Sequence, residues 1–472
     1  MIAPAWGLVS RFLRTRYVIH ILGYNKIDYS YIPEGESVNA IHIHGGVPLH
    51  GEVKVQGSKN AILPILAATV LIKGTCIIKN CPNISDVTCM MKLLQSIGCT
   101  ACWDNQDIVI DAIHIKEKRL PKEYVTGMRS SVILMGALLG RTGEVSLDYP
   151  GGCVIGDRPI DIHIYALKQL GTEITDKNDC LHAKAVKLIG NRINLKFPSV
   201  GATENTILAA VLAEGVTNVY NCAKEPEITA LCSFLNKAGA KITGAGTERI
   251  EIEGVESLKP ILYEVDSDRI VAGTYIFSVM ATSGEITLRN APVQYLNSTI
   301  LAAKRIGCSI KLMQNDILVK SKRPLLSRPF IETQVYPGFP SDLQSMLLVV
   351  LSLAEGNSVV REKIFNNRFR VAEELNRMGA TIEIKDQDAF IKGNCSLKGR
   401  SVVAEDLRGG AALVLAGLCA DGDTFVNNYQ FIERGYEDIC RDYRALGASV
   451  RRYCEEIQLT SNHKEIRENM EL

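Results

Sequence analysis

The chain has 472 residues, which is enough for two or three domains of ordinary size. Its composition, 46% hydrophobic and 22% charged, is typical of a globular protein with a substantial core. The formal net charge of +1 excludes the strongly basic surface that nucleic acids or acidic membranes attract. Because no run of about 18 apolar residues is present, we expect no membrane insertion.

Residues 1–38 differ in character from the rest of the chain. Apolar stretches alternate there with Arg11, Arg14 and Arg16, which interrupt the apolar core that a signal peptide needs. We expect an N-terminal extension without fixed structure, or a start codon assigned too far upstream. A helix bound weakly to a membrane surface is the alternative. Residues 461–472 are expected to form a C-terminal tail.

Six apolar helices are predicted along the chain, and each ends at a glycine that precedes a strand. They fall within residues 56–74, 127–143, 198–215, 267–284, 339–356 and 406–422. After each of these units comes an amphipathic helix, another glycine and two short strands around a polar turn, at residues 93–110, 167–183, 235–252, 303–319, 375–391 and 443–459. The unit therefore repeats six times with a period of about 70 residues, as in repeat architectures.

The glycines after the amphipathic helices are the most regular marks of the repeat: Gly98, Gly171, Gly239, Gly307, Gly379 and Gly447. A glycine in this place commonly ends a helix in the left-handed conformation. The regular period excludes a two-domain Rossmann enzyme. No glycine-rich nucleotide-binding sequence follows a predicted strand either.

The apolar helices share one position near their first turn, 14 or 15 residues before the closing glycine. In chain order it holds Lys59, Arg129, Gly201, Arg269, Asp342 and Arg408. Helices that are apolar on all sides are buried, and their N-termini already carry partial positive charge. A cation is unfavourable there unless an anion lies in front of the helix. The pattern therefore predicts an anion-binding cleft, whereas the alternative is that these charges merely reach solvent.

A second set of cations follows the strand after the apolar helix, in the loops that carry Arg158, Arg368 and Arg434. Two sets of cations at one cleft imply a strongly anionic ligand, such as a phosphate with a carboxylate, or a diphosphate. Arginine suits both groups because its guanidinium pairs with them through two parallel hydrogen bonds.

The loop that carries Arg158 also contains Cys153, in the segment "PGGCVIGDRP". Fourteen cysteines in a chain of this length do not indicate a disulfide scaffold, so we expect reduced thiols and a cytoplasmic location. Arg158 favours the thiolate of Cys153, whereas Asp157 opposes it. From these residues alone, a catalytic thiol and a small buried side chain are equally supported.

Two short patterns are weak candidates for metal sites. Cys99 and Cys102 form a C-x-x-C pair without a second half. His42 and His44 alternate along a predicted strand without further ligands nearby. We therefore expect no metal.

Ten ordered segments resemble the UDP-N-acetylglucosamine 1-carboxyvinyltransferase family of the EPSP synthase-like superfamily. They are "GSKNAILPILAAT", "MRSS", "PGGCVIGDRPIDIH", "PSVGATEN", "AKEPEI", "GTERIEIEGV", "YPGFPSDLQ", "NRFRVAEELNRMGA", "EDLRGGAALVLAG" and "RGYEDICRDYRALGA". The resemblance covers residues 41 to about 460. It implies an α/β fold of two domains, the inside-out α/β barrel, with three repeats around a pseudo-three-fold axis in each. Residues 59–266 would form one domain, and residues 39–58 together with 267–460 the other.

The resemblance also implies a reaction. The enolpyruvyl group of phosphoenolpyruvate moves to the 3′-hydroxyl of UDP-N-acetylglucosamine and phosphate leaves, by addition and elimination, in the first committed step of peptidoglycan synthesis. No cofactor or metal is implied. Fosfomycin is the implied inhibitor, and we expect a monomer or a weak oligomer in the cytoplasm, with no nucleic-acid partner.

The resemblance assigns roles to individual residues. The implied catalytic residues are Cys153, Asp342, Lys59 and Arg408. The implied phosphoenolpyruvate-binding residues are Lys59, Arg129, Arg158, Arg368 and Arg408. The residues implied for UDP-N-acetylglucosamine are Asn60, Arg129, Arg158, Pro159, Asp161, His163, Ser199, Gly201, Asp342 and Ile364.

The chain departs from the family pattern at Ser58, Asp157 and Val271. Val271 stands where the family usually has a glutamate, which removes a carboxylate near the cleft or hinge. These departures leave three alternatives: a paralogue acting on another uridine nucleotide, the shikimate branch of the superfamily, and a catalytically silent binding protein. This chain lacks the "D-K-S" and "G-T-x-x-R" motifs that are expected of the shikimate branch.

Overall fold

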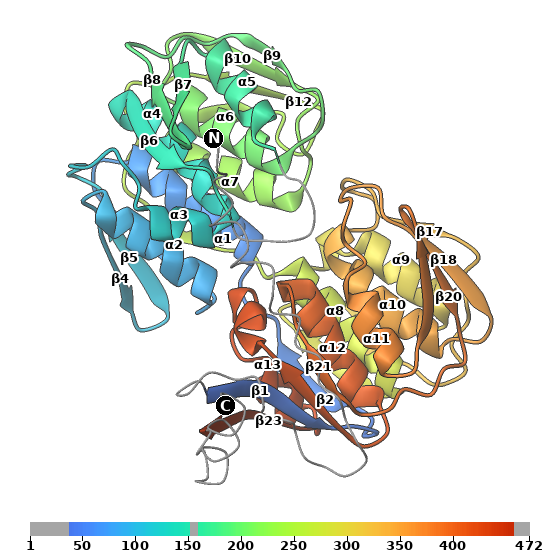
Figure 1. Cartoon of the computed structure of the whole chain (residues 1–472). Coiled ribbons are helices and arrows are strands. Elements are labelled where there is room, and N and C mark those ends of the chain that lie inside the picture. Colours follow the sequence, from blue (N-terminus) through green and yellow to red (C-terminus); the bar gives the residue numbers. More distant parts are fainter. Residues whose placement is uncertain (1–36, 152–158, 457–472) are drawn as a thin grey trace, which may run out of the picture. The chain divides into compact units, whose positions relative to one another are not determined.

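The computed structural model describes residues 37–151 and 159–456 (Figure 1). This part of the chain contains six β-sheets, and each repeat combines one sheet with a buried helix and an amphipathic helix, with a further short helix at Lys122–Gly127 in repeat two. The six predicted repeats are therefore confirmed. Among the described residues, no helix combines the length and apolar character that a membrane span requires.

The first three repeats comprise the following elements. Repeat one has α1 (Lys59–Ala68), α2 (Ser85–Ser96) and the sheet β13 (Leu262–Glu264), β3 (Thr75–Lys79), β5 (Asp107–Asp111) and β4 (Thr100–Asp104). Repeat two has α3 (Lys122–Gly127), α4 (Leu134–Thr142), α5 (Asp161–Gln169) and the sheet β6 (Glu144–Asp148), β8 (Cys180–Lys184) and β7 (Glu173–Lys177). Repeat three has α6 (Val200–Ala210), α7 (Pro226–Lys237) and the sheet β11 (Lys241–Thr243), β12 (Arg249–Glu253), β10 (Val216–Tyr220) and β9 (Arg192–Asn194).

The last three repeats follow the same plan. Repeat four has α8 (Arg269–Thr282), α9 (Asn297–Ile306) and the sheet β15 (Ser309–Met313), β16 (Asp316–Lys320), β14 (Glu285–Arg289) and β2 (His50–Lys54). Repeat five has α10 (Gln344–Leu353), α11 (Val371–Arg377) and the sheet β17 (Ile331–Glu332), β18 (Asn357–Arg361), β20 (Asp388–Lys392) and β19 (Thr381–Lys385). Repeat six has α12 (Leu407–Cys419), α13 (Ile439–Ala445) and the sheet β21 (Ser401–Val403), β22 (Asp423–Asn427), β1 (Ser37–His44) and β23 (Ser449–Glu456).

Strand pairing within the sheets is shared among repeats. In repeats one to five the strand after the buried helix pairs antiparallel with a later strand of its unit, as where Val360 of β18 lies opposite Ala389 of β20, and in repeat six β22 pairs antiparallel with the N-terminal β1. In five of the six sheets this strand also has a parallel neighbour. In repeat four this neighbour is β2, in which Val53 lies opposite Leu288 of β14. The N-terminal strands thus complete sheets of the last three repeats.

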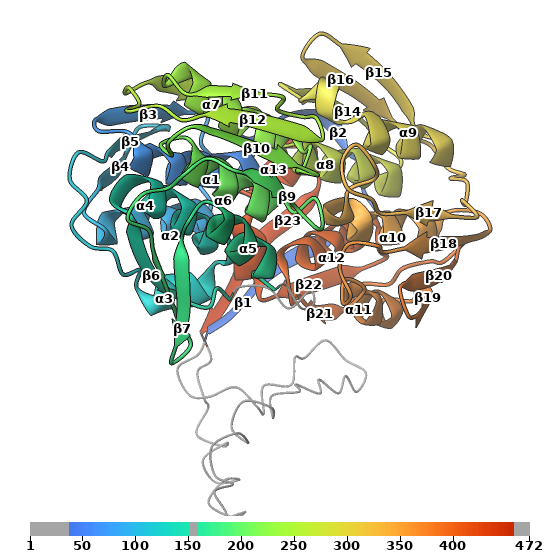
Figure 2. The same cartoon turned by 90° about the horizontal axis from the view of Figure 1, so that it is seen from above.

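Two clusters of buried apolar side chains form the core. One runs from Ala61 to Val265, and the other combines Ile41–Val55 with residues 270–450. In the second cluster α8, α10 and α12 pack on one another, and the sheets lie outside them (Figure 2). The buried helices are thus inside and the sheets outside, as predicted for the fold class. The clusters support the predicted division at residues 58–59 and 266–267, which stays a prediction.

The glycine caps and the helix starts were predicted correctly, with one difference. All six glycines after the amphipathic helices have a left-handed backbone, with φ from 88° to 115°. The helices α1 and α8 start at Lys59 and Arg269. Arg129 and Asp342 instead lie in 3₁₀ turns, Arg129–Ile133 and Ser341–Leu343, which precede α4 and α10. Such turns are common at helix N-termini, and their tighter winding is set by packing rather than by composition.

The close approach of α4 and α6 offers a test of the fold near the helix ends. A methyl group on Gly136 would lie 2.2 Å from the carbonyl oxygen of Asn205, whose side chain also accepts a hydrogen bond from the Gly136 N–H at 2.7 Å. We expect Gly136→Ala to lower the free energy of unfolding by about 1–3 kcal/mol or more, because neither backbone can give way. Urea unfolding measures this change. Gly127→Ala is the control, since a methyl group there meets no atom within 4 Å. Equal stability of the two variants would contradict the packing described.

Candidate active site

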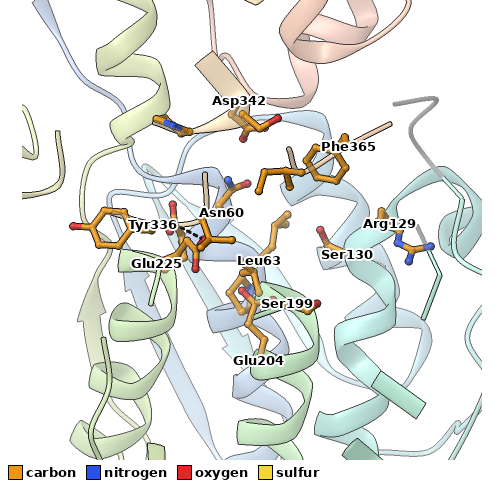
Figure 3. Close-up of a pocket in the computed structure, with 18 of the residues that line it drawn as sticks. Asn60, Leu63, Arg129, Ser130, Ser199, Glu204, Glu225, Tyr336, Asp342 and Phe365 are labelled. Atoms are coloured by element: carbon orange, nitrogen blue, oxygen red, sulfur yellow. Dashed lines mark hydrogen bonds between the residues drawn. The ribbon is translucent and has the colours of Figure 1, made fainter. Parts of the chain in front are cut away.

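One cavity of about 510 Å³, a size typical of small-molecule sites, collects the predicted site residues. All of the candidates within the described residues line it: Lys59, Asn60, Arg129, Pro159, Asp161, His163, Ser199, Gly201, Asp342, Ile364, Arg368 and Arg408. Cys153, Asp157 and Arg158 lie outside the described residues. Figure 3 shows Asn60 between Asp342 on one side and Glu204 on the other. The roles assigned to these residues stay predictions.

The helix ends at this cavity are capped by the protein itself. Ser58 accepts a hydrogen bond from the N–H of Ala61 at 3.3 Å, and Ser199 caps α6 in the same way. Asp268 caps α8 and Asp406 caps α12, each accepting from two N–H groups. Side chains therefore already satisfy several N–H groups at these helix starts. The anion-binding cleft would rest mainly on the lysine and arginine side chains and stays a prediction. Ser58, a departure from the family pattern, has a clear structural role as a cap.

Asp342 lies between two buried arginines. Arg368 donates to its Oδ1 at 2.6 Å and Arg408 to its Oδ2 at 3.2 Å. Both arginine side chains are 4% exposed, whereas the Asp342 side chain keeps 29% exposure. Burial alone would raise the pKa of Asp342. The charges of Arg408 and Arg368, with smaller contributions from Lys59 and Arg269, outweigh burial and hold that pKa far below its ordinary value.

A second carboxylate, Asp86, joins two cations at the cavity wall. It contacts Lys59 Nζ at 2.9 Å and Arg434 Nε at 2.9 Å. Arg434, which the sequence placed in the second set of cations, thus reaches the same cavity. Burial raises the pKa of Asp86, but the charges and hydrogen bonds of Lys59 and Arg434 lower it below the ordinary value overall.

The segment 159–163, which contains residues that the resemblance assigns to UDP-N-acetylglucosamine, meets α6 through His163. Asn205 Nδ2 lies 2.8 Å from His163 Nδ1, which fixes the orientation of the buried ring. A methyl group on Gly201 would come within 2.9 Å of His163 Cε1, so only glycine permits this approach. Arg129 donates to the carbonyl oxygens of Pro150 at 3.4 Å and Pro159 at 3.2 Å.

Three glutamates of the cavity were missed by the sequence reasoning. Glu227 forms a buried ion pair with Arg269 at 3.1 Å, and Glu225 accepts a hydrogen bond from the Tyr336 N–H at 3.3 Å. Glu204 is 3% exposed. Burial raises the pKa of Glu204, and the neighbouring charges of Glu227 and Glu225 raise it further. The motifs "AKEPEI" and "PSVGATEN" contain all three, so the signal was present but carried no role.

Val271 and the pair His42 and His44, which the sequence singled out, lie outside the cavity. Val271 is fully buried in the second apolar cluster and does not line the cavity, so its change from glutamate alters the core rather than the cavity wall. His42 and His44 both contact Asp423, at 2.8 and 3.2 Å. Within residues 37–151 and 159–456, no cluster of three or more histidines, cysteines or carboxylates is arranged to hold a metal ion.

Comparison with known proteins now bears on the assembled site. The family model described as EPSP synthase (3-phosphoshikimate 1-carboxyvinyltransferase) matches residues 43–442. The chain belongs to this family. UDP-N-acetylglucosamine 1-carboxyvinyltransferase 2 of Caldanaerobacter subterraneus subsp. tengcongensis is 47% identical over 86% of this chain and 98% of that protein. The UDP-N-acetylglucosamine 1-carboxyvinyltransferase of Clostridium botulinum is 43% identical over 88% of this chain and 99% of that protein.

Solved structures agree on the fold. The enolpyruvyl transferase NikO from Streptomyces tendae has a TM-score of 0.80 at 25% identity, over 89% of this chain and 100% of that one. EPSP synthase from Acinetobacter baumannii has a TM-score of 0.67 at 18% identity, over 88% of this chain and 100% of that one, which shows the fold alone. The predicted resemblance and the predicted fold class are therefore confirmed for this member of the EPSP synthase family.

The buried carboxyl of Glu204 predicts a pH dependence of stability. Its pKa in the folded protein is raised above the ordinary 4.5, so above pH 4.5 the unfolded chain releases a proton that the folded chain keeps. The free energy of unfolding therefore falls as pH rises from 4.5 to the folded pKa, by up to about 1.4 kcal/mol per pH unit. Glutamine does not titrate, so we expect Glu204→Gln to be more stable than the wild type at about pH 8. This difference in the free energy of unfolding should vanish near pH 4.5, the ordinary pKa of glutamate.

Urea unfolding at several pH values measures this slope. The control is Glu256→Gln, because Glu256 is exposed and does not line the cavity. Its curve should run parallel to that of the wild type. A Glu204→Gln curve that is also parallel to the wild type would contradict the raised pKa.

Proposed function

We propose that the protein transfers the enolpyruvyl group of phosphoenolpyruvate to the 3′-hydroxyl of UDP-N-acetylglucosamine, releasing phosphate, in the first committed step of peptidoglycan synthesis. The observation that carries the proposal is one cavity that gathers the cations and the carboxylate matched to this family. Relatives that carry this activity in their names are up to 47% identical over nearly their whole length. No cofactor is required by the chemistry below.

The reaction needs two proton transfers. The sugar hydroxyl oxygen adds to C2 of the enolpyruvyl group while its proton goes to a base and C3 gains a proton from an acid. C3 then loses a proton, the C2–O bond to phosphate breaks, and the double bond is restored. Asp342 is the proposed base and Cys153 the proposed acid. Lys59, Arg368 and Arg408 would stabilise the phosphate and carboxylate charges.

Asp342 becomes a competent base only when an anion is bound. Without a bound anion, the arginine charges hold the pKa of Asp342 far below its ordinary value, which disfavours acceptance of a proton. A phosphate or carboxylate that shares Arg368 and Arg408 offsets their charge, and the pKa of Asp342 then rises. The hydroxyl proton would therefore be removed only in the presence of phosphoenolpyruvate.

The alternative, a paralogue acting on another uridine nucleotide, is not favoured. The enolpyruvyl transferase NikO is 25% identical to this chain, far below the 47% of the carboxyvinyltransferase named above. EPSP synthase from Acinetobacter baumannii, which represents the shikimate branch, is more distant still, at 18%. A silent binding protein would not need the paired Asp342, Arg368 and Arg408. A cytoplasmic location and a monomeric or weakly associating state complete the proposal.

Phosphate release from phosphoenolpyruvate, with UDP-N-acetylglucosamine, UMP or shikimate 3-phosphate as acceptor, tests the function directly. We expect release only with UDP-N-acetylglucosamine. Asp342→Asn should lower kcat by about 10²–10⁴-fold, because the base is lost while the cations remain. Asp386→Asn, an exposed turn residue, is the matched control and should retain full activity. Release with UMP instead would favour the paralogue, and no release with any acceptor would favour the silent protein.

Fosfomycin tests the proposed role of Cys153. The thiolate would attack an epoxide carbon, the C–O bond would open, and the oxygen would take a proton, so the protein gains the mass of one inhibitor molecule. We expect Cys153→Ala to abolish this mass increase and to lose activity. Cys102→Ala, which removes an exposed thiol, should behave as the wild type in both measurements. Full activity of Cys153→Ala would contradict an acid role for this thiol.

A further inference from the structure

Asp86 occupies an unusual place among the charges of the cavity. It lies in the first turn of α2 and is 4% exposed. Its Oδ2 lies 2.9 Å from Lys59 Nζ, and Arg434 donates to Oδ1 from Nε at 2.9 Å and to Oδ2 from Nη2 at 3.3 Å. All three side chains line the cavity. One buried carboxylate therefore holds two cations of the anion site at once.

The three residues come from distant parts of the chain. Lys59 begins α1, whereas Arg434 ends the 3₁₀ turn Tyr429–Arg434 of repeat six, 348 residues beyond Asp86. Asp86 lies on α2, whose apolar side chains belong to the first cluster, whereas the turn that carries Arg434 packs on the second cluster through Ile432. The ion pair therefore links elements of the two clusters. Two nitrogens of its guanidinium bind the same carboxylate, and this fork geometry fixes the plane of the group. Without Asp86, neither long side chain has this anchor.

Asp86 also differs from the other carboxylates of the site. Asp342 keeps 29% exposure and faces the cavity, as a group that meets the substrate must. The Asp86 side chain is only 6% exposed, less than the 12% and 17% of the two cations that it binds. A lysine has three donors and an arginine five, so each can bind Asp86 and still contact a ligand.

We propose that Asp86 is a positioning residue, which holds Lys59 and Arg434 side by side as a preformed site for the phosphate of phosphoenolpyruvate. The inference rests on the proposed function for the identity of the anion. Two cations that contact one carboxylate are close enough for one phosphate to bridge them. Asp86 also offsets their mutual repulsion in the empty cavity, so that the pair stays in place before the substrate arrives.

The test compares the two substrates kinetically. We expect Asp86→Asn to raise KM for phosphoenolpyruvate about tenfold or more, since the two cations lose their shared anchor. KM for UDP-N-acetylglucosamine should change by less than about threefold, because Asp86 pairs with Lys59 and Arg434 and neither is matched to that substrate. Asp86→Glu, which keeps the charge, should restore part of the affinity. An unchanged or lowered KM for phosphoenolpyruvate in folded Asp86→Asn would overturn the proposal.

The matched control is Asp148→Asn. Asp148 is also buried, at 6% exposure, and also pairs with an arginine, Arg119, at 3.1 Å, but it does not line the cavity. A loss of stability without any change of either KM is expected. If Asp148→Asn and Asp86→Asn raise KM equally, Asp86 has only a structural role.

A binding measurement separates this proposal from the proposed function. Calorimetric titration with phosphoenolpyruvate or inorganic phosphate, each with the wild type, Asp86→Glu and Asp86→Asn, needs no turnover. Absence of enolpyruvyl transfer by the wild type would refute the function alone. Equal affinity of the wild type and Asp86→Asn for both anions would refute the role of Asp86 alone. Where Asp86→Asn fails to fold, a wild-type affinity of Asp86→Glu despite the displaced carboxylate would equally overturn the proposal.

Discussion

The burial of paired charges is the constraint on which the rest of this site depends. Four cations of the cavity, Lys59, Arg368, Arg408 and Arg434, are at least four-fifths buried at their side chains. A buried charge without a partner is costly, so each must meet a carboxylate. Asp342 pairs with Arg368 and Arg408, and Asp86 pairs with Lys59 and Arg434. Each carboxylate is therefore shared by two cations.

The repeat supplies the cations, and the assembly of repeats supplies their partners. Asp342 comes from repeat five and pairs with Arg408 of repeat six. Glu227 of repeat three pairs with Arg269 of repeat four. Lys59 pairs with Asp86 of its own repeat, but Arg434 of repeat six shares that carboxylate. Each of these charge clusters thus joins at least two repeats, which makes the cavity a property of the assembled repeats rather than of one unit.

The helices and strands could be predicted from the sequence, but the ion pairs between side chains could not. The glycine series, the buried helices and the cations near their first turns follow from local rules of periodicity and capping, and the structure has them where expected. The 3₁₀ start of α10 at Ser341–Leu343 does not follow, because packing decides between tight and ordinary winding. Asp86 and Glu204 were missed because an acidic residue in the first turn or body of a helix is ordinary in sequence. Only its neighbours in space, such as Arg434 at 348 residues' separation, make it part of the site.

The shared carboxylates also explain how an anionic substrate can bind where anions already are. Asp342 and Asp86 offset two of the four positive charges of Lys59, Arg368, Arg408 and Arg434, so an anionic substrate still meets a net positive charge there. The helix N-termini contribute less than the sequence implied, because Ser58, Ser199, Asp268 and Asp406 cap them. Affinity must therefore come from donors left over on arginine and lysine, and each such contact weakens the hold on a protein carboxylate. In the proposed reaction, phosphate bound to these cations would raise the pKa of Asp342, and the arrival of phosphoenolpyruvate would thereby be coupled to activation of the acceptor hydroxyl.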